Sequence, residues 1–119
     1  MTFEAFIPHW HPTPLNRLFG SHWATASRMK KADAAIIAIY CRAIPKATGK
    51  RRLSVEIVLK PKQRRCDPDA YHKSLCDALV KAKCLVNDSS HYVELSPVQY
   101  ERGTDREWGT KLTLENICE

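Results

Sequence analysis

The sequence lacks several features that would place the protein outside the cytoplasm. No apolar stretch is long enough to span a membrane. The N-terminus has no basic segment followed by an apolar run, as a signal peptide would have. The 5 cysteines are odd in number and form no C-x-x-C pair. We therefore expect reduced thiols in a cytoplasmic protein that has no membrane partner.

Motifs for nucleotide and metal binding are also missing or weak. The chain has no G-x-x-x-x-G-K-[ST] loop, so NTP binding through a P-loop is not supported. A zinc site built from Cys66, Cys76 and Cys84 would need spacings that match no common pattern. Cys66 and Cys76 are better explained as small packing residues than as nucleophiles. His9 and His11 could share a metal, but the neighbouring prolines favour a surface loop.

The charge balance points to a polyanionic partner. The 119 residues fit one compact domain, and 44% hydrophobic content allows a modest core. Lys and Arg number 19 against 13 Asp and Glu, which gives a formal net charge of +6. Nucleic acid is the simplest partner for such a chain, although a basic protein that is merely soluble would have the same balance.

The hydrophobic pattern predicts one small α/β or α+β domain over residues 1–119, without repeats or linkers. We predict strands over 2–7, 53–60, 92–100 and 108–117, a helix over 21–42 with Ser21 as N-cap, and a second helix that begins at Asp67-Pro68. The core side of the first helix is predicted to carry Met29, Ala32, Ile36, Ile39 and Tyr40. The core side of the second is predicted to carry Tyr71, Leu75, Ala78, Leu79 and Ala82.

Acidic and basic residues gather around the start of the second predicted helix. Asp67 and Asp69 stand one residue apart, Lys73 follows on the same helical face as Asp69, and Asp88 lies just beyond the helix end. Carboxylates bind Mg²⁺ or Mn²⁺, whereas arginine and lysine bind phosphate. An acidic cluster within a basic chain is what a metal-dependent phosphodiesterase needs, because the enzyme must hold a cation and attract a polyanion.

A structural explanation of the same residues is equally consistent with the spacing. Asp67 is a good N-cap, Asp69 gains from the helix dipole and can pair with Lys73, and Asp88 can belong to an ordinary turn. Local geometry does not bring Asp88 to the helix start, unless the following chain folds back. Spacing alone therefore leaves both explanations open.

The motif residues resemble the signature of the RusA family of Holliday junction resolvases. That signature contains D-x-D-N-x-x-K, a downstream D-A-L and a D-D pair after the helix. The matching segments here are Arg64-Arg65-Cys66-Asp67-Pro68-Asp69, Lys73, Asp77-Ala78-Leu79 and Asn87-Asp88, and Pro12 to Arg17 is similar to the family's P-x-x-x-N-R segment. The resemblance implies a mixed sheet of about four strands with two main helices. It also implies a homodimeric, Mg²⁺-dependent endodeoxyribonuclease that resolves four-way DNA by paired symmetric nicks in recombination and repair.

The resemblance also implies roles for individual residues. Asp67, Asp69 and Asp88 would bind the catalytic Mg²⁺, which Mn²⁺ could replace, and Lys73 would be needed for activity. Two positions depart from the signature, because Ala70 replaces its asparagine and Asn87 replaces the first acid of its D-D pair. These departures motivate an alternative, a catalytically weak or inactive protein that binds branched DNA. A third possibility is a ribosome- or RNA-associated basic protein without an active site.

The expected DNA surface is basic. Side chains beside the cut are expected to be Lys60, Lys62, Arg64 and Arg65, with Lys50, Arg51 and Arg52 extending the surface from a predicted turn. His72 and His91 could assist proton transfer, although such histidines are more often partly buried polar groups. The three tryptophans could stack on bases, but core packing or a subunit interface better explains at least two of them.

Overall fold

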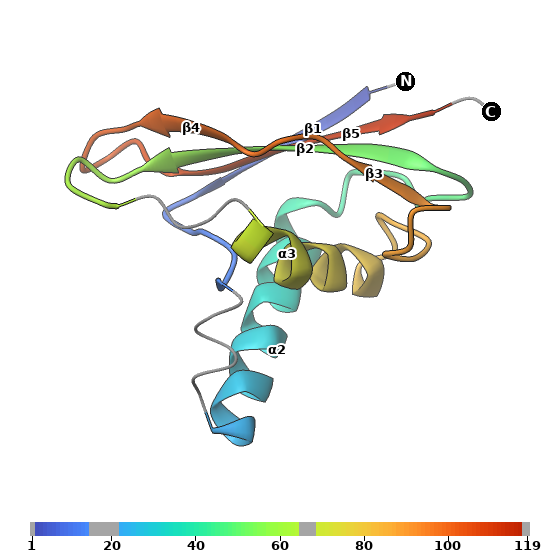
Figure 1. Cartoon of the computed structure of the whole chain (residues 1–119), viewed down its shortest axis with the longest axis horizontal. Coiled ribbons are helices and arrows are strands. Elements are labelled where there is room, and N and C mark those ends of the chain that lie inside the picture. The colour runs from blue at the N-terminus through green and yellow to red at the C-terminus, as the bar shows by residue number, and fades with distance from the viewer. Residues whose placement is uncertain (1, 15–21, 65–68, 118–119) are drawn as a thin grey trace.

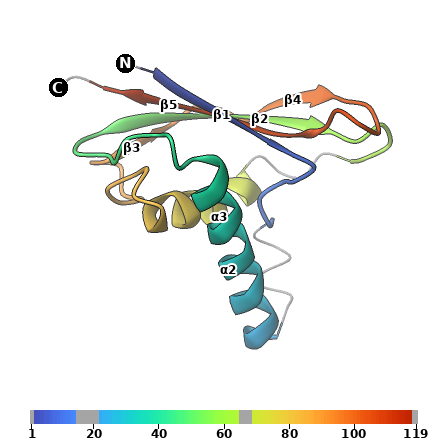
Figure 2. The same cartoon turned by 180° about the vertical axis from the view of Figure 1, so that it is seen from behind.

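The protein folds into two layers, a twisted sheet and a pair of helices that cover one of its faces (Figure 1). The computed structural model describes residues 2–14, 22–64 and 69–117, with only the backbone at residue 69. The elements are β1 (Thr2–Pro8), α2 (Trp23–Tyr40), β2 (Arg51–Leu59), α3 (Asp69–Lys81), β3 (Val93–Leu95), β4 (Gln99–Arg102) and β5 (Gly109–Asn116). The turned view in Figure 2 shows that the face of the sheet opposite the helices is uncovered.

The sheet is mixed, which confirms the predicted α+β class. β5 lies between β1 and β2 and is antiparallel to both, while β3 and β4 pair in parallel with the other edge of β2. The sheet has five strands where about four were predicted, because the segment 92–100 forms two strands. Pro97 lies in the gap between them and has no N–H to donate to the ladder.

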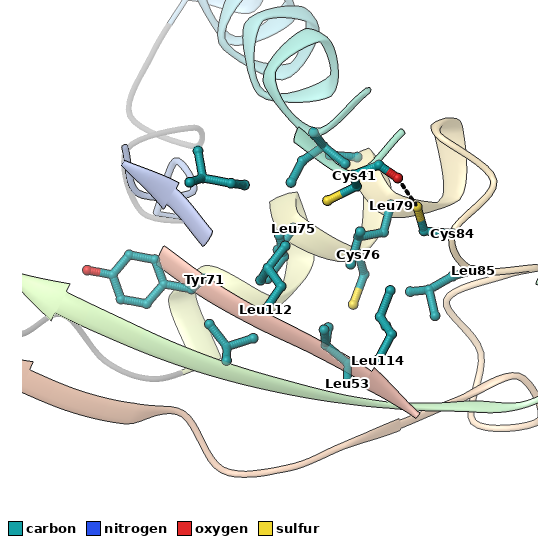
Figure 3. Close-up of a cluster of buried hydrophobic side chains, with 14 of the residues drawn as sticks. Cys41, Leu53, Tyr71, Leu75, Cys76, Leu79, Cys84, Leu85, Leu112 and Leu114 are labelled. Atoms are coloured by element: carbon teal, nitrogen blue, oxygen red, sulfur yellow. Dashed lines mark hydrogen bonds between the residues drawn. The ribbon is translucent and has the colours of Figure 1, made fainter. Parts of the chain in front are cut away.

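The core lies between the helices and the sheet. The alternation in β2 is confirmed, since Leu53, Val55, Ile57 and Leu59 are all buried against the helices. Figure 3 shows the apolar side of α3 against the sheet. The predicted stripe of this helix is confirmed for Tyr71, Leu75, Ala78 and Leu79, which are buried, and Ala82 packs against the same core. Burial of each large apolar side chain contributes about 1.5–3 kcal/mol.

The predicted core side of α2 is right only in part, since Ile36 packs against the core and Met29 is half-buried, but Ala32, Ile39 and Tyr40 are exposed. The buried residues of this helix are Asp33 and Ile37, whereas Ile39 is 62% exposed and Tyr40 is 45% exposed. The predicted N-cap is wrong, because the cap is His22. Apolar spacing misplaces the buried stripe because one of its members is an aspartate.

Burial of Asp33 is possible because its carboxylate has hydrogen-bond donors. Trp10 Nε1 donates to Oδ1 over 3.2 Å, and the backbone N–H of Thr13 donates to Oδ2 over 3.1 Å. The Ser74 hydroxyl of α3 donates to the Thr13 carbonyl over 2.6 Å. The segment after β1 is thus hydrogen-bonded to both helices.

Candidate active site

Lys73 lies between two carboxylates at the side of α3. Its Nζ is 3.4 Å from Asp77 Oδ1, one helical turn further on, and 3.4 Å from Asp88 Oδ2, in the loop after the helix. The charge of Asp77 and the hydrogen bond that Lys73 donates to Asp88 raise the pKa of Lys73. The ammonium therefore stays protonated at neutral pH. It can stabilise negative charge, but it cannot serve as a general base.

Asp88 reaches Lys73 because the chain reverses sharply at the end of α3. Lys83 has a φ of 65°, in the left-handed region, and its N–H donates to the Val80 carbonyl over 3.0 Å. The N–H of Cys84 donates to the Leu79 carbonyl over 2.9 Å. This pair of bonds is a Schellman motif, which ends a helix and turns the chain back. Leu85, next to Cys84, is 2% exposed and anchors the returning chain in the core.

A second turn presents Asp88 to solvent. The Asn87 side-chain oxygen accepts a hydrogen bond of 3.0 Å from the N–H of Ser89, which is an Asx-turn with Asp88 at its centre. The Asp88 side chain is 45% exposed. An aspartate at position 87 could accept the same hydrogen bond, so this departure from the RusA signature leaves the turn intact. The turn expected on structural grounds is present at Asp88, whereas the convergence of Asp88 with Asp67 and Asp69 stays a prediction, since the side chains of residues 67 and 69 lie outside the described part of the structure.

Asp77 and Asp88, the two carboxylates that contact Lys73, border a cleft between the two helices and the loop. The cleft has a volume of about 320 Å³ and is lined by Lys30, Ser74, Asp77, Ala78, Val80, Lys81, Asn87 and Asp88. Sequence reasoning used Asp77 only as a motif residue and missed Lys30 altogether. The spacing of four residues from Lys73 could have identified Asp77. No local signal identifies Lys30, because the packing of α2 on α3 brings it there.

The remaining predicted metal ligands are only partly described. Asp67 lies outside the described residues, and Asp69 is the first residue of α3, four residues before Lys73. Positions four apart on a helix are neighbours on one side of it. The backbone therefore places position 69 on the side of α3 where Lys73 meets Asp88. Among the residues that the structure describes, no group of three or more His, Cys, Asp or Glu could hold a metal ion.

The described cysteines are packing residues. Cys41, Cys76 and Cys84 are buried free thiols, whereas Cys66 lies outside the described residues. Burial, with smaller effects from Asp88 and Asp77, raises the pKa of Cys76 to about 11. A thiol with this pKa is almost wholly protonated at pH 7, and so it is a poor nucleophile and metal ligand.

The two histidines of the segment after β1 have structural contacts. His9 Nε2 lies 2.9 Å from the Arg106 carbonyl oxygen, and His11 Nε2 lies 2.9 Å from the Val58 carbonyl oxygen. Their rings lie against Trp108, with centroids 5.3 Å and 5.1 Å away. These contacts favour a role in fastening the loops at this end of the sheet.

Basic residues lie at both ends of β2. Lys60, Lys62 and Arg64, in the loop that follows the strand, are all exposed, and Arg65 lies outside the described residues. Lys60 Nζ stands 4.4 Å from the centroid of the Trp108 ring, a cation–π contact that fixes its direction. Lys60, Lys62 and Arg64 are therefore accessible for binding phosphate.

The residues at the start of β2 are placed differently. Arg51 and Arg52 belong to the strand and not to the predicted turn. Arg51 is only 2% exposed, and it donates to Asn116 Oδ1 over 2.8 Å and to the Cys84 carbonyl over 2.9 Å. A guanidinium buried in this way cannot bind DNA, which corrects the prediction for Arg51. Lys50 is half-buried.

Arg52 lies on the uncovered face of the sheet with two acidic partners. It forms ion pairs with Glu94 of β3 and Glu115 of β5. Both partners face it across the strands, as the pairing register requires. Its positive charge is therefore largely compensated.

Comparison of the sequence with models of protein families gives no match, and comparison with curated proteins gives none. The likeness to RusA enzymes thus consists of the motif residues themselves. Of these, Lys73, Asp77 and Asp88 lie together in the described structure.

No helix among the described residues is long and apolar enough to cross a membrane.

Proposed function

We propose that the protein is a metal-dependent endonuclease that cuts branched DNA. The observation that carries the proposal is the return of Asp88 to Lys73, 15 residues earlier, at the start of α3. The two other acids of the motif, Asp67 and Asp69, precede Lys73 in the sequence, and position 69 lies on the same side of α3 as Lys73. The RusA resemblance supplies the substrate, a four-way junction, and the outcome, paired symmetric nicks.

The cleft offers suitable chemistry for Mg²⁺. The metal prefers oxygen ligands and keeps several waters, so it needs only a few exposed carboxylates. The Asp88 contact with Lys73, at 3.4 Å, is longer than a strong charge-assisted hydrogen bond, so this carboxylate is not firmly committed. Asp67, Asp69 and Asp88 would hold the ion. When bound, it would lower the pKa of a water and stabilise charge on the scissile phosphate, and Mn²⁺ could replace it.

The chain's cations then have distinct tasks. Lys73, kept protonated by Asp77 and Asp88, would donate a hydrogen bond to an oxygen of the scissile phosphate as negative charge develops there. Lys60, Lys62 and Arg64 would bind neighbouring phosphates and hold the strand in register. Arg51 has no such task because it is buried.

The test uses a labelled four-way junction and a duplex of the same sequence. We expect paired nicks in the junction with Mg²⁺ or Mn²⁺, no cleavage with EDTA, and binding without cleavage in Ca²⁺. Lys73→Ala should lower the single-turnover rate by roughly 100- to 1,000-fold, the usual cost of a lost charge-stabilising donor. Asp88→Asn should abolish cleavage while junction binding stays intact or tightens. Lys111→Ala, an exposed lysine of β5 outside the cleft, is the matched control and should cut normally.

Three outcomes would contradict this proposal. Junction binding without cleavage under any metal would favour the catalytically weak DNA-binding alternative. Tighter binding to structured RNA than to the junction would favour the RNA-associated alternative. Normal cutting by Asp88→Asn would remove Asp88 from the site.

We also propose that the active form is a homodimer, because two symmetric nicks require two active sites. Sedimentation of the protein with and without a junction should show two chains per junction. One chain per junction, with paired nicks retained, would contradict this assembly.

A further inference from the structure

The first half of α2 extends away from the other described elements of the protein. Its second half packs on α3 and the sheet, where Ile37 is fully buried, whereas the first half reaches past both (Figure 1, Figure 2). Trp23, at the start of the helix, is 76% exposed, which is the largest exposure among the exposed large apolar residues of the described chain. A tryptophan so exposed is uncommon and calls for a partner.

Trp23 lies on the stripe of α2 that turns toward the protein. Trp23, Lys30 and Ile37 follow each other at intervals of seven residues. Seven residues are nearly two helical turns, so the three residues share one side of the helix. Ile37 contacts the core, and Lys30 borders the cleft with Asp77 and Asp88. Trp23 therefore stands about 10 Å beyond Lys30 along the helix, on the side of the cleft.

The charge of this region suits a polyanion. The chain contains no acidic residue between Glu4 and Asp33. Asp33 itself is buried, and its carboxylate accepts hydrogen bonds from Trp10 and Thr13. The projecting half of α2 thus presents cations and carries no carboxylate of its own, next to the cleft where the proposed cut occurs.

We propose that the stripe of Trp23 and Lys30 forms one wall of the DNA-binding groove. Lys30 contacts a phosphate close to the scissile one, and Trp23 stacks on a base at the branch point, where bases are most easily unstacked. This inference rests on the proposed function and adds the surface that recognises the branch. An indole ring gives about tenfold or more in affinity for a stacked base.

A second copy of the chain fits this stripe less well. A lysine in the middle of an apolar seam between helices would have to be desolvated, which opposes association. Against DNA the same lysine meets a phosphate.

His22, the N-cap, lies with its ring 5.6 Å from that of Trp23 and tilted by 37°, which helps to orient the indole.

The test uses the full chain, with Ca²⁺ to permit binding without cleavage, and a junction that carries 2-aminopurine at the branch. Trp23→Ala should lose about tenfold in junction affinity but little in duplex affinity, and should abolish the fluorescence change of 2-aminopurine on binding. Trp23→Phe should restore most of both. Lys30→Ala should weaken binding to both DNAs and reduce the salt slope by about one. Arg28→Ala, a cation on the far side of the same helix, is the matched control and should change less than Lys30→Ala.

Three results would overturn the inference: a Trp23→Ala protein with wild-type junction preference, Arg28→Ala effects equal to those of Lys30→Ala, or a Trp23→Ala protein that changes from dimer to monomer in sedimentation. Failure of the proposed function has a different signature, because the wild type itself would then neither cut nor prefer the junction. The Lys30 and Arg28 comparison on duplex DNA would still decide whether the stripe contacts DNA.

Discussion

The two ends of β2 carry basic clusters that look alike in sequence and differ in the folded protein. Lys50, Arg51 and Arg52 precede or open the strand, and Lys60, Lys62 and Arg64 follow it. At the start, one guanidinium is buried and the next is paired with two glutamates. At the end, all three side chains are exposed. A run of basic residues therefore indicates charge, while only its surroundings decide whether that charge can reach DNA.

The largest expected effect is on the buried member of the first cluster. Arg51→Ala would leave the Cys84 carbonyl and Asn116 without their donor and open a gap in the core. We expect the free energy of unfolding to fall by about 3 kcal/mol, as is typical when a buried charged hydrogen-bonding group is lost. Urea denaturation measures this loss, with Lys50→Ala as the control. An unchanged unfolding midpoint, with weaker DNA binding, would mean that Arg51 is a DNA contact after all.

The second cluster should behave in the opposite way. Lys62→Ala combined with Arg64→Ala should leave the unfolding free energy unchanged, because both side chains are exposed. Junction affinity should fall by about tenfold or more, and the slope of log affinity against log salt should decrease by about two, one for each phosphate contact. Fluorescence anisotropy over a salt series measures both. Unchanged affinity would show that DNA passes elsewhere.

The difference between the two basic clusters should become smaller when Arg52 loses its acidic partners. Glu94→Gln with Glu115→Gln removes the charges that compensate this guanidinium. If the uncovered sheet face lies within reach of DNA, affinity should rise by about two- to fivefold, since one further cation becomes available. The control is the same pair of changes combined with Arg52→Ala, which should cancel the gain. A gain that persists in this control would reflect the general loss of negative charge.

The smallest expected effect concerns two acids on the same uncovered face. A hydrogen bond with Glu101, followed by burial and the charge of Glu101, raises the pKa of Glu56 above its ordinary value of 4.5. The proton that this pair holds stabilises the fold fully below pH 4.5, and this contribution is lost as pH rises through the raised pKa. Glu56→Gln keeps a donor to Glu101 and should be slightly more stable than the wild type at pH 7. Thermal denaturation at pH 4 and pH 7 should show a difference only at pH 7.

Much of the fold follows from local pattern. The alternation of β2 and the apolar stripe of α3 are readable because most of their buried positions are apolar. The two helices and the strands of the described chain lie close to the predicted ranges. The stripe of α2 is partly misread because Asp33 lies on its buried side, where only the donors from Trp10 and Thr13 make it tolerable. The strand over 92–100 is misread at Pro97, which divides it.

In the candidate site, too, some features follow from local sequence and others from tertiary packing. The sequence by itself determined which residue types are present and which neighbours lie on one helix, such as Lys73 and Asp77, because helical geometry is local. Tertiary structure alone decided that the chain turns back at Lys83 and delivers Asp88 to Lys73, and that Lys30 of α2 borders the same cleft. It also decided which arginines are buried. These contacts join residues far apart in the chain, and they depend on how the helices pack on the sheet, which no short segment encodes.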